Sequence, residues 1–300
     1  MEAQREAVTS SALDASYELL RESCGVLDHL DLAVIELRGD DRKGWLQGQV
    51  TNDLRSFTTG THAQFCFVSV TGQIEADCWG WALQDRILIT TSQSAAAAVM
   101  DRCRRMVILE DVQARLVDEL RLLSIQGPEA TRELTDRLPL PSLDAGDSRY
   151  EDAPVVCLRS NRTGYGGWDL LAASEAASKI AASLPAITPE AYDVARLEAG
   201  IPLMGRDIDS RTLPPELGDA FEVRNVSYSK GCYLGQEVLM RLHARGHTNR
   251  TWMALLSEEV LEQGAIVSHA SRPDAGVVTS ASWSPRYGAI AAAMIRREAS

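Results

Sequence analysis

Several features that mark large classes of protein are missing from this sequence. No apolar run approaches the length of about 20 residues that a membrane-spanning helix needs. Residues 1–7 are polar and helix-forming, without the basic and then apolar order of a secretory signal. The phosphate-binding loop of NTPases, the helix motif of zinc proteases and the nucleophile elbow of α/β-hydrolases are also absent. We therefore expect a cytoplasmic protein of another class, without a membrane partner.

The six cysteines are scattered through the 300 residues, and they form neither a C-x-x-C pair nor a cluster with histidine. This pattern argues against a zinc site and against a disulfide framework, and it suits a reducing compartment. We therefore expect no metal site.

Acidic residues outnumber basic ones, 42 against 30, and the net charge is −12. Direct nucleic-acid binding is not expected, because it requires a basic surface. Residues 224–250 depart from this balance with a net charge of +4, and we call them the basic segment. Its cations are Arg224, Lys230, Arg241, Arg245 and Arg250. The basic segment is either a solvated helix face or a pocket for an anionic small molecule.

Apolar periodicity and turn residues predict alternating helices and strands. The expected helices span 2–23, 41–50, 94–105, 174–184, 188–200 and 236–245, with Asp40 and Ser94 as N-caps. One more helix is expected to begin at Gly127-Pro128. The expected strands span 31–38, 64–70, 73–82, 86–91, 120–125, 155–159, 169–172, 252–256, 265–267, 276–282 and 289–295.

This order indicates an α+β protein. Residues 139–154 are polar and aperiodic, so we expect a loop there that separates two sub-lobes. Residues 1–245 would form the α+β body. The closely spaced strands of residues 246–300 predict a small barrel or sandwich, and we expect a β-barrel-like module there.

The most specific local pattern is the octapeptide K-G-C-Y-L-G-Q-E at residues 230–237. Two glycines permit tight turns around Cys232, and a helix is expected to start at Gly235. A neighbouring cation and a helix N-terminus both stabilise a thiolate, so Cys232 is a candidate reactive thiol. The alternative is a small buried hydrophobe, the commoner fate of a lone cysteine. The separation of Cys232 from His243 and His247 along the chain disfavours a Cys–His pair.

The octapeptide resembles the signature of the YgfZ family of folate-binding proteins. These are relatives of the aminomethyltransferase, or T-protein, of the glycine cleavage system. The resemblance extends in patches over nearly the full chain. It implies an aminomethyltransferase-like folate-binding body, with tetrahydrofolate or a one-carbon derivative as the cofactor.

Two further segments carry the resemblance. R-L-E-A-G-I-P at residues 196–202 is similar to the segment whose glutamate grips the pterin ring, which implies that role for Glu198. One carboxylate can accept from both the ring N–H and the exocyclic amino group of a pterin. The alternative is an ordinary Glu198 at a helix end, compensated by Arg196 or by solvent. R-T-G-Y-G-G-W-D at residues 162–169 resembles a stretch that lines the folate site, where Tyr165 either stacks on the ring or packs in the core.

Two weaker segments add Asn52 and Asp77. L-Q-G-Q-V-T-N-D at residues 46–53 resembles another YgfZ segment, so Asn52 either faces the pocket or only forms a turn. G-Q-I-E-A-D at residues 72–77 corresponds to a strand that carries two successive acids in aminomethyltransferases, one of which is proposed to act on the folate nitrogen. This chain has Ala76-Asp77 there, and which of the two positions matters stays open.

The leading interpretation is a tetrahydrofolate-binding protein similar to YgfZ. By that resemblance it would assist assembly or repair of iron–sulfur clusters, with iron–sulfur enzymes or assembly proteins as partners. The basic segment would meet the carboxylates of the glutamate tail. The implied cofactor-binding residues are Glu198, Tyr165, Asn52, Lys230, Tyr233 and Arg241. The candidate catalytic residues are Cys232 and Asp77. Two alternatives are a folate-dependent aminomethyl or methyl transferase that uses Asp77, and a folate-independent scaffold.

Overall fold

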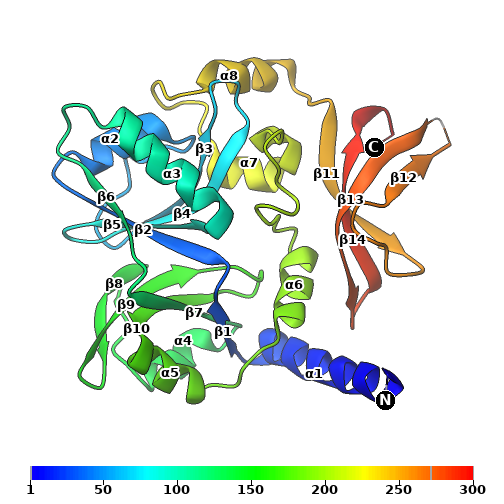
Figure 1. The fold of residues 1–300 in the computed structure, drawn as a ribbon, viewed down its shortest axis with the longest axis horizontal. Helices are drawn as coiled ribbons and strands as arrows, with labels where there is room; N and C mark the ends of the chain where they lie inside the picture. Colours follow the sequence, from blue (N-terminus) through cyan, green and yellow to red (C-terminus); the bar gives the residue numbers. More distant parts are fainter. Residues whose placement is uncertain (1, 271, 300) are drawn as a thin grey trace.

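Three antiparallel sheets form the framework of the chain in a computed structural model that describes residues 2–270 and 272–299 (Figure 1). The first sheet has the order β3-β4-β5-β2-β6. Its strands are β2 (Leu32–Arg38), β3 (His62–Val68), β4 (Ile74–Ala82), β5 (Ile87–Ser92) and β6 (Gln113–Leu116). Helices α2 (Arg42–Gln49) and α3 (Gln93–Met106) cover its outer face, where residues such as Trp45, Ala76 and Val99 form one buried apolar cluster.

The second sheet has the order β1-β7-β10-β9-β8. Its strands are β1 (Gly25–His29), β7 (Leu120–Gln126), β8 (Ala145–Tyr150), β9 (Ala153–Ser160) and β10 (Gly167–Ala173). Helices α4 (Ala130–Thr135) and α5 (Ser174–Ala182) pack on its outer face. The inner faces of the two sheets meet in a cluster that includes Trp81, Leu88, Leu158 and Leu171, so the body has four layers.

Alternation along β4 decides which side chains enter which layer. Successive residues of a strand point to opposite faces. Ala76 and Cys78 lie in the outer cluster with α3, whereas Trp81 lies in the inner cluster between the sheets. Asp77 and Trp79 share the inner face with Trp81 because they have the same parity.

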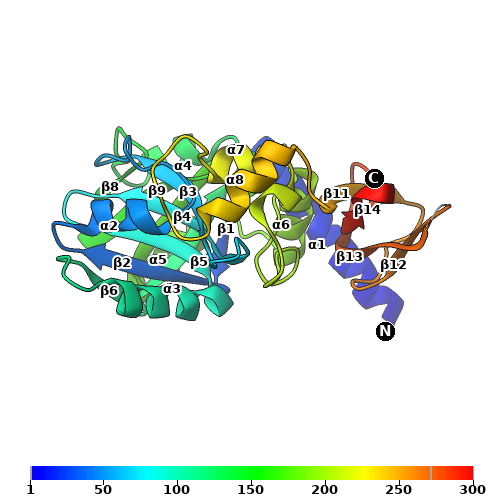
Figure 2. The ribbon, with the colours of Figure 1, turned by 90° about the horizontal axis from the view of Figure 1, so that it is seen from above.

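A third layer of helices joins the body to the C-terminal strands. It comprises α1 (Glu2–Glu22), α6 (Pro189–Glu198), the 3₁₀ turn η1 (Pro214–Leu217), α7 (Asp219–Asn225) and α8 (Gln236–Arg245). The C-terminal sheet has the order β11-β14-β13-β12, and both Figure 1 and Figure 2 place it beyond α6 from the other two sheets, with α1 running toward it. Its strands are β11 (Arg250–Ser257), β12 (Ile266–His269), β13 (Arg272–Ser284) and β14 (Gly288–Arg296), followed by η2 (Arg297–Ala299).

This sheet corrects the expectation of a β-barrel. The described residues of β11 and β12 stand at opposite ends of the strand order and do not pair, so the sheet is open. Four strands are too few to close on themselves; instead, one end of the sheet packs on the helical layer through Trp252, Ile290 and Ala292.

Most predicted elements are confirmed, and the errors have local causes. The loop expected at 139–154 is wrong, because β8 and the start of β9 lie there; β8 exposes alternate polar residues, so its apolar pattern is weak. The predicted caps shift as well. Ser92, not Ser94, accepts from the Ala95 N–H at 3.2 Å, and α2 has Asp41 rather than Asp40 at its N-cap.

The remaining differences are the first residue of one helix and a few short elements that were not predicted. The helix expected at Gly127-Pro128 begins at Ala130, because the Gly127 N–H bonds to the carbonyl of Gly166 and the chain turns there first. Short elements with little periodicity, namely β1, β6 and α7, are not among the predicted ones. No helix in residues 2–270 or 272–299 is both long and apolar enough to span a membrane.

A buried ion pair fastens the C-terminal sheet to α6. The Arg196 guanidinium pairs with Asp207, and both side chains are almost fully buried. Arg196 also donates to the Ser280 hydroxyl of β13 at 2.8 Å, and Ser280 donates to Asp207 at 2.7 Å. The pair therefore links α6, the 201–208 segment and β13.

Asp207→Ala is expected to lower the free energy of unfolding by about 3–5 kcal/mol, because it leaves Arg196 charged and without Asp207 in the interior. Urea unfolding followed by circular dichroism measures this change. Asp274→Ala, which removes the exposed partner of Arg272 from the same strand, is the control and should change little. Equal effects of the two substitutions would contradict the assigned role of Asp207.

Candidate functional site

A cavity of about 190 Å³ lies where the first two sheets meet α6 and α7. Strand ends, one glycine-rich loop and two helices contribute to it, so segments far apart in the sequence face a common space. Among its polar and aromatic lining residues are His29, Asp31, Gln64, Asp77, Trp79, Asn161, Arg162, Tyr192, Phe221 and Arg224. We call this space the central cavity.

Asp77 is the predicted catalytic residue that lines the central cavity. Its neighbour Ala76 is fully buried in the layer beneath α3 and cannot reach the same space. Burial raises the pKa of the Asp77 carboxyl to about 7, against the lowering effect of Arg162 and Arg224. Of the pair Ala76-Asp77, the acid is therefore the member that faces the central cavity.

Arg162, which lines the central cavity, forms a buried ion pair with Asp169. Arg162 donates to one Asp169 oxygen at 2.6 and 2.8 Å, and to the Thr90 hydroxyl of β5 at 3.0 Å. The other Asp169 oxygen accepts from the hydroxyls of Ser124 and Ser160 at 2.7 and 2.9 Å. With all these bonds made, the buried carboxylate is well satisfied, and the guanidinium is held in a fixed position.

The Trp79 ring lies in one wall of the central cavity and is stacked on two rings outside the lining. The Trp79 ring lies 5.6 Å from that of His62 and 5.9 Å from that of Trp81, and both pairs are stacked. Arg162 lies 5.8 Å from the centroid of Trp79. A flat, partly apolar surface with a cation beside it suits a planar heteroaromatic ligand.

Asn52 lies behind the wall rather than in it. Its amide donates to the carbonyls of Gln64 and Arg224, each at 2.7 Å. Both of those residues line the central cavity, so Asn52 sets the spacing between β3 and the end of α7. Arg224 is exposed and forms no ion pair with any residue that the structure describes, so its charge is available at the cavity.

Glu198 and Tyr165 flank the central cavity without lining it. Glu198 ends α6 as predicted, but its carboxylate accepts from the hydroxyls of Tyr17 and Ser284, on α1 and β13. Tyr165 packs in the cluster around α1 and α6. The residues beside them, Gly164 and Ala199, do line the cavity.

The contact between those two segments requires glycine. A Cβ on Gly164 would lie 2.6 Å from the Cβ of Ala199, and the φ of Gly164 is +87°, which disfavours other residues. The two motifs therefore meet at the cavity wall through their small residues.

The octapeptide 230–237 connects the end of α2 to the start of α8 through buried contacts. The Lys230 ammonium donates to the carbonyls of Gln47, Val50 and Asn52 at 2.6, 2.6 and 2.7 Å, where α2 ends. A cation suits a helix C-terminus, and burial lowers the pKa of Lys230 to about 8. At Gly235 a Cβ would lie 2.3 Å from the Ser69 carbonyl oxygen, so only glycine fits.

The other predicted residues of this region are dispersed. Cys232 is exposed, whereas the other five cysteines are buried. Tyr233 is buried in the cluster around α1 and α6, with Lys230 5.0 Å from its ring centroid. Arg241 is exposed and pairs with Glu237 at 2.7 Å. These three residues do not line the central cavity, and neither does Lys230.

Sequence reasoning missed His29, Asp31, Trp79 and Tyr192 as lining residues. The signal for Trp79 was present, because it follows Asp77 at the spacing that places two residues on one face of a strand. No comparable signal exists for His29 and Tyr192, since their positions depend on how the second sheet meets α6.

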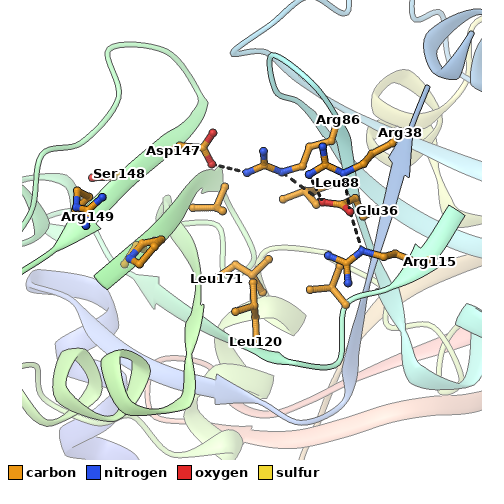
Figure 3. A pocket seen from close by; sticks show the side chains of 14 residues that line it. Glu36, Arg38, Arg86, Leu88, Arg115, Leu120, Asp147, Ser148, Arg149 and Leu171 are labelled. Atoms are coloured by element: carbon orange, nitrogen blue, oxygen red, sulfur yellow. Dashed lines mark hydrogen bonds and ion pairs between the residues drawn. The ribbon is translucent and has the colours of Figure 1, made fainter. Parts of the chain in front are cut away.

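A second cavity, of about 570 Å³, lies on the seam between the first two sheets. Figure 3 shows Arg38, Arg86 and Arg115 converging on Glu36 within it. Burial acts to raise the pKa of Glu36, but hydrogen bonds from Arg38 and Arg115 outweigh it and hold the pKa below its ordinary value.

The charges of this second cavity are balanced. Arg86 reaches across the seam to Asp147 of β8, Arg38 also pairs with Asp85, and Arg115 pairs with Glu119. Since each of these guanidinium groups already has carboxylate partners, the network fastens one sheet to the other rather than presenting a free anion site.

Comparisons with known proteins agree with this geometry. Residues 4–225 match the family described as the GCVT N-terminal domain. Aminomethyltransferases of Synechococcus sp. strains RCC307 and WH7803 are 29% and 30% identical to this chain, and each alignment covers 93% of this chain and 80% of the relative. The glycine cleavage system aminomethyltransferase T of Bartonella henselae has the same fold, with a TM-score of 0.81 at 19% identity over 95% of this chain and 81% of that one.

The four-layer body with its appended sheet is thus the aminomethyltransferase fold. The chain belongs to the GCVT family of aminomethyltransferase-like proteins. This confirms the predicted kinship with the T-protein.

Asp77 is expected to make folding stability depend on pH. Its folded pKa of about 7 exceeds the ordinary value of 3.8, so ionising Asp77 destabilises the folded state. This loss of stability is nearly absent below pH 3.8 and reaches its full size above pH 7. Asp77→Asn should therefore raise the free energy of unfolding by about 1–2 kcal/mol at pH 8, allowing for solvent screening, and change it little at pH 4. Urea unfolding across this range tests the trend; a difference that does not grow with pH would contradict it.

Proposed function

We propose that the protein binds tetrahydrofolate in the central cavity and takes part in one-carbon transfer of the aminomethyl type. The observation that carries this proposal is Asp77, an acid with a pKa of about 7 on the wall of the cavity. Its position in the chain corresponds to the acid pair of aminomethyltransferases, and relatives with that name align over most of this chain.

The residues around the cavity suit a reduced folate. Trp79 and Tyr192 offer aromatic surface to a flat pterin. Arg224, the member of the basic segment that lines the cavity, suits the carboxylates of a glutamate tail. Asn52 would act indirectly, by holding Arg224 and Gln64 in place.

The chemistry assigned to this chain is proton transfer by Asp77. A carboxyl group with a pKa near the working pH can both release and accept a proton. Arg162 and Arg224 favour its charged form, whereas burial favours its neutral form. When bound, tetrahydrofolate supplies the nitrogen that carries the one-carbon unit.

Titration of the purified protein with tetrahydrofolate, followed by calorimetry, tests the pocket. Trp79→Ala is expected to weaken binding about tenfold by removing the stacking surface. Trp283→Ala, at an exposed residue of β13, should leave the affinity unchanged. Glu198→Ala and Tyr165→Ala in the same titration decide whether the two flanking residues also contribute. An absence of binding by the parent protein would leave the folate-independent scaffold as the better account.

Transfer itself is tested separately. Formation of methylene-tetrahydrofolate from a methylamine-type donor is expected to fall about 100-fold or more in Asp77→Asn, with tetrahydrofolate affinity within a few fold of the parent. Transfer at the parental rate by this variant would contradict the role given to Asp77.

The exposed thiol favours a second candidate function. We propose, as the alternative, a YgfZ-like role in assembly or repair of iron–sulfur clusters, in which Cys232 acts on a partner enzyme or assembly protein. Its support is the family octapeptide together with the exposure of Cys232.

Complementation of an iron–sulfur-deficient strain separates the two functions. The alternative expects rescue by the parent and loss of rescue in Cys232→Ser, while Cys103→Ser, at a buried cysteine, serves as the comparison for structural effects. Full rescue by Cys232→Ser would reduce the cysteine to a structural residue.

A further inference from the structure

A histidine–carboxylate pair on the wall of the central cavity has no role in the function proposed above. His29 is the last residue of β1, and Asp31 lies in the turn that leads into β2. The His29 Nδ1 lies 3.0 Å from the Asp31 Oδ1. Both residues line the central cavity.

The second nitrogen of His29 has no partner. The side chain of His29 is 2% exposed, and its Nε2 forms no hydrogen bond with any residue in the described part of the chain. Buried polar atoms of this kind are rare in folded proteins, because an unmade hydrogen bond is costly. Since His29 lines the central cavity, a ligand bound there is a candidate partner for this nitrogen.

The surroundings fix what the free nitrogen can do. A carboxylate only accepts, so in the neutral ring the pairing with Asp31 places the proton on Nδ1 and leaves Nε2 with its lone pair as an acceptor. The ring of Tyr192 meets the His29 ring edge to face, with centroids 5.3 Å apart and planes at 75°. Asp31 and Tyr192 therefore hold the imidazole in one orientation.

None of the arginines that line the central cavity donates a hydrogen bond to His29 Nε2 in the described part of the chain. Arg162 is engaged by Asp169, and Arg196 by Asp193 and Asp207. Arg224 is exposed at the end of α7, and it forms no hydrogen bond with His29.

We propose that His29 is a ligand-binding residue whose Nε2 accepts a hydrogen bond from an N–H group of the ligand, with Asp31 as its positioning residue. This inference rests on the proposed function. It adds a specificity determinant: a pterin carries ring N–H and exocyclic amino donors, and His29 Nε2 accepts from one of them, which leaves Asp77 for the nitrogen that carries the one-carbon unit. A flat aromatic ligand without N–H donors would leave His29 unpaired and bind weakly.

Calorimetric titration with tetrahydrofolate tests the assignment in three variants. His29→Phe keeps a flat ring against Tyr192 but removes the acceptor, and it is expected to raise Kd about 10- to 100-fold. His29→Gln retains an acceptor at a similar reach and should recover part of that loss. His247→Gln, at an exposed histidine outside the cavity, is the control and should bind like the parent.

The outcomes are distinct. If the parent binds and His29→Phe binds equally well, this inference fails while the proposed function stands; if the parent does not bind, both fail. A thermal midpoint for His29→Phe at or above that of the parent shows that the lost affinity is not a folding defect. Should His29→Phe not fold, His29→Leu takes its place as a variant without an acceptor, and equal affinity of His29→Leu and the parent would overturn the proposal.

The positioning role of Asp31 is tested through the tautomer of the His29 ring, which a residue with a purely structural role would not change. In Asp31→Asn, nitrogen NMR of the His29 ring is expected to show the Nε2-protonated tautomer gaining population, with weaker tetrahydrofolate binding. An unchanged tautomer in a variant that binds like the parent would remove Asp31 from the assignment.

Discussion

The buried pair of Arg162 and Asp169 is the interaction on which the cavity depends. Asp169 lies on β10 and is bonded by hydroxyls from β7 and β9, while Arg162 reaches the hydroxyl of Thr90 on β5. The pair therefore joins three strands of the second sheet to one of the first. The same guanidinium lies beside Trp79 and acts on the charge of Asp77. The Arg162 guanidinium therefore both holds the two sheets together and influences the charge of the site.

Much of the layered body could be predicted from the sequence because its elements are strongly periodic. The end of α6 at Glu198, followed by Gly200 with a φ of +64°, matches the capping pattern read from the residues. Edge strand β8 could not be recognised, since only Ala145 within it is buried. A barrel was expected from close strand spacing alone, yet closure depends on pairing between strands that sequence spacing does not specify.

The sequence motifs predict which segments reach the candidate site better than they predict which side chains line it. The motifs around Tyr165 and Glu198 do reach the cavity, but through Gly164 and Ala199, one residue away from each. A one-residue step on a helix or a turn redirects a side chain completely, and tertiary packing against Tyr17 and Ser284 decides that step for Glu198. Lys230 and Gly235 show the same limit, because they have clear structural tasks at the ends of α2 and α8.

The position of β1 in the second sheet has a consequence for the order of events during synthesis. Gly25 pairs with Gln126 and His29 with Leu122, so this strand waits for partners that emerge roughly 100 residues later. Contacts of such long range form slowly, because the chain must first close a large loop. A nascent chain that has completed only the first sheet would carry Asp77 and Trp79 but no opposite wall. The cavity is therefore assembled late, and occupancy by a ligand would stabilise the finished arrangement of both sheets rather than either one alone.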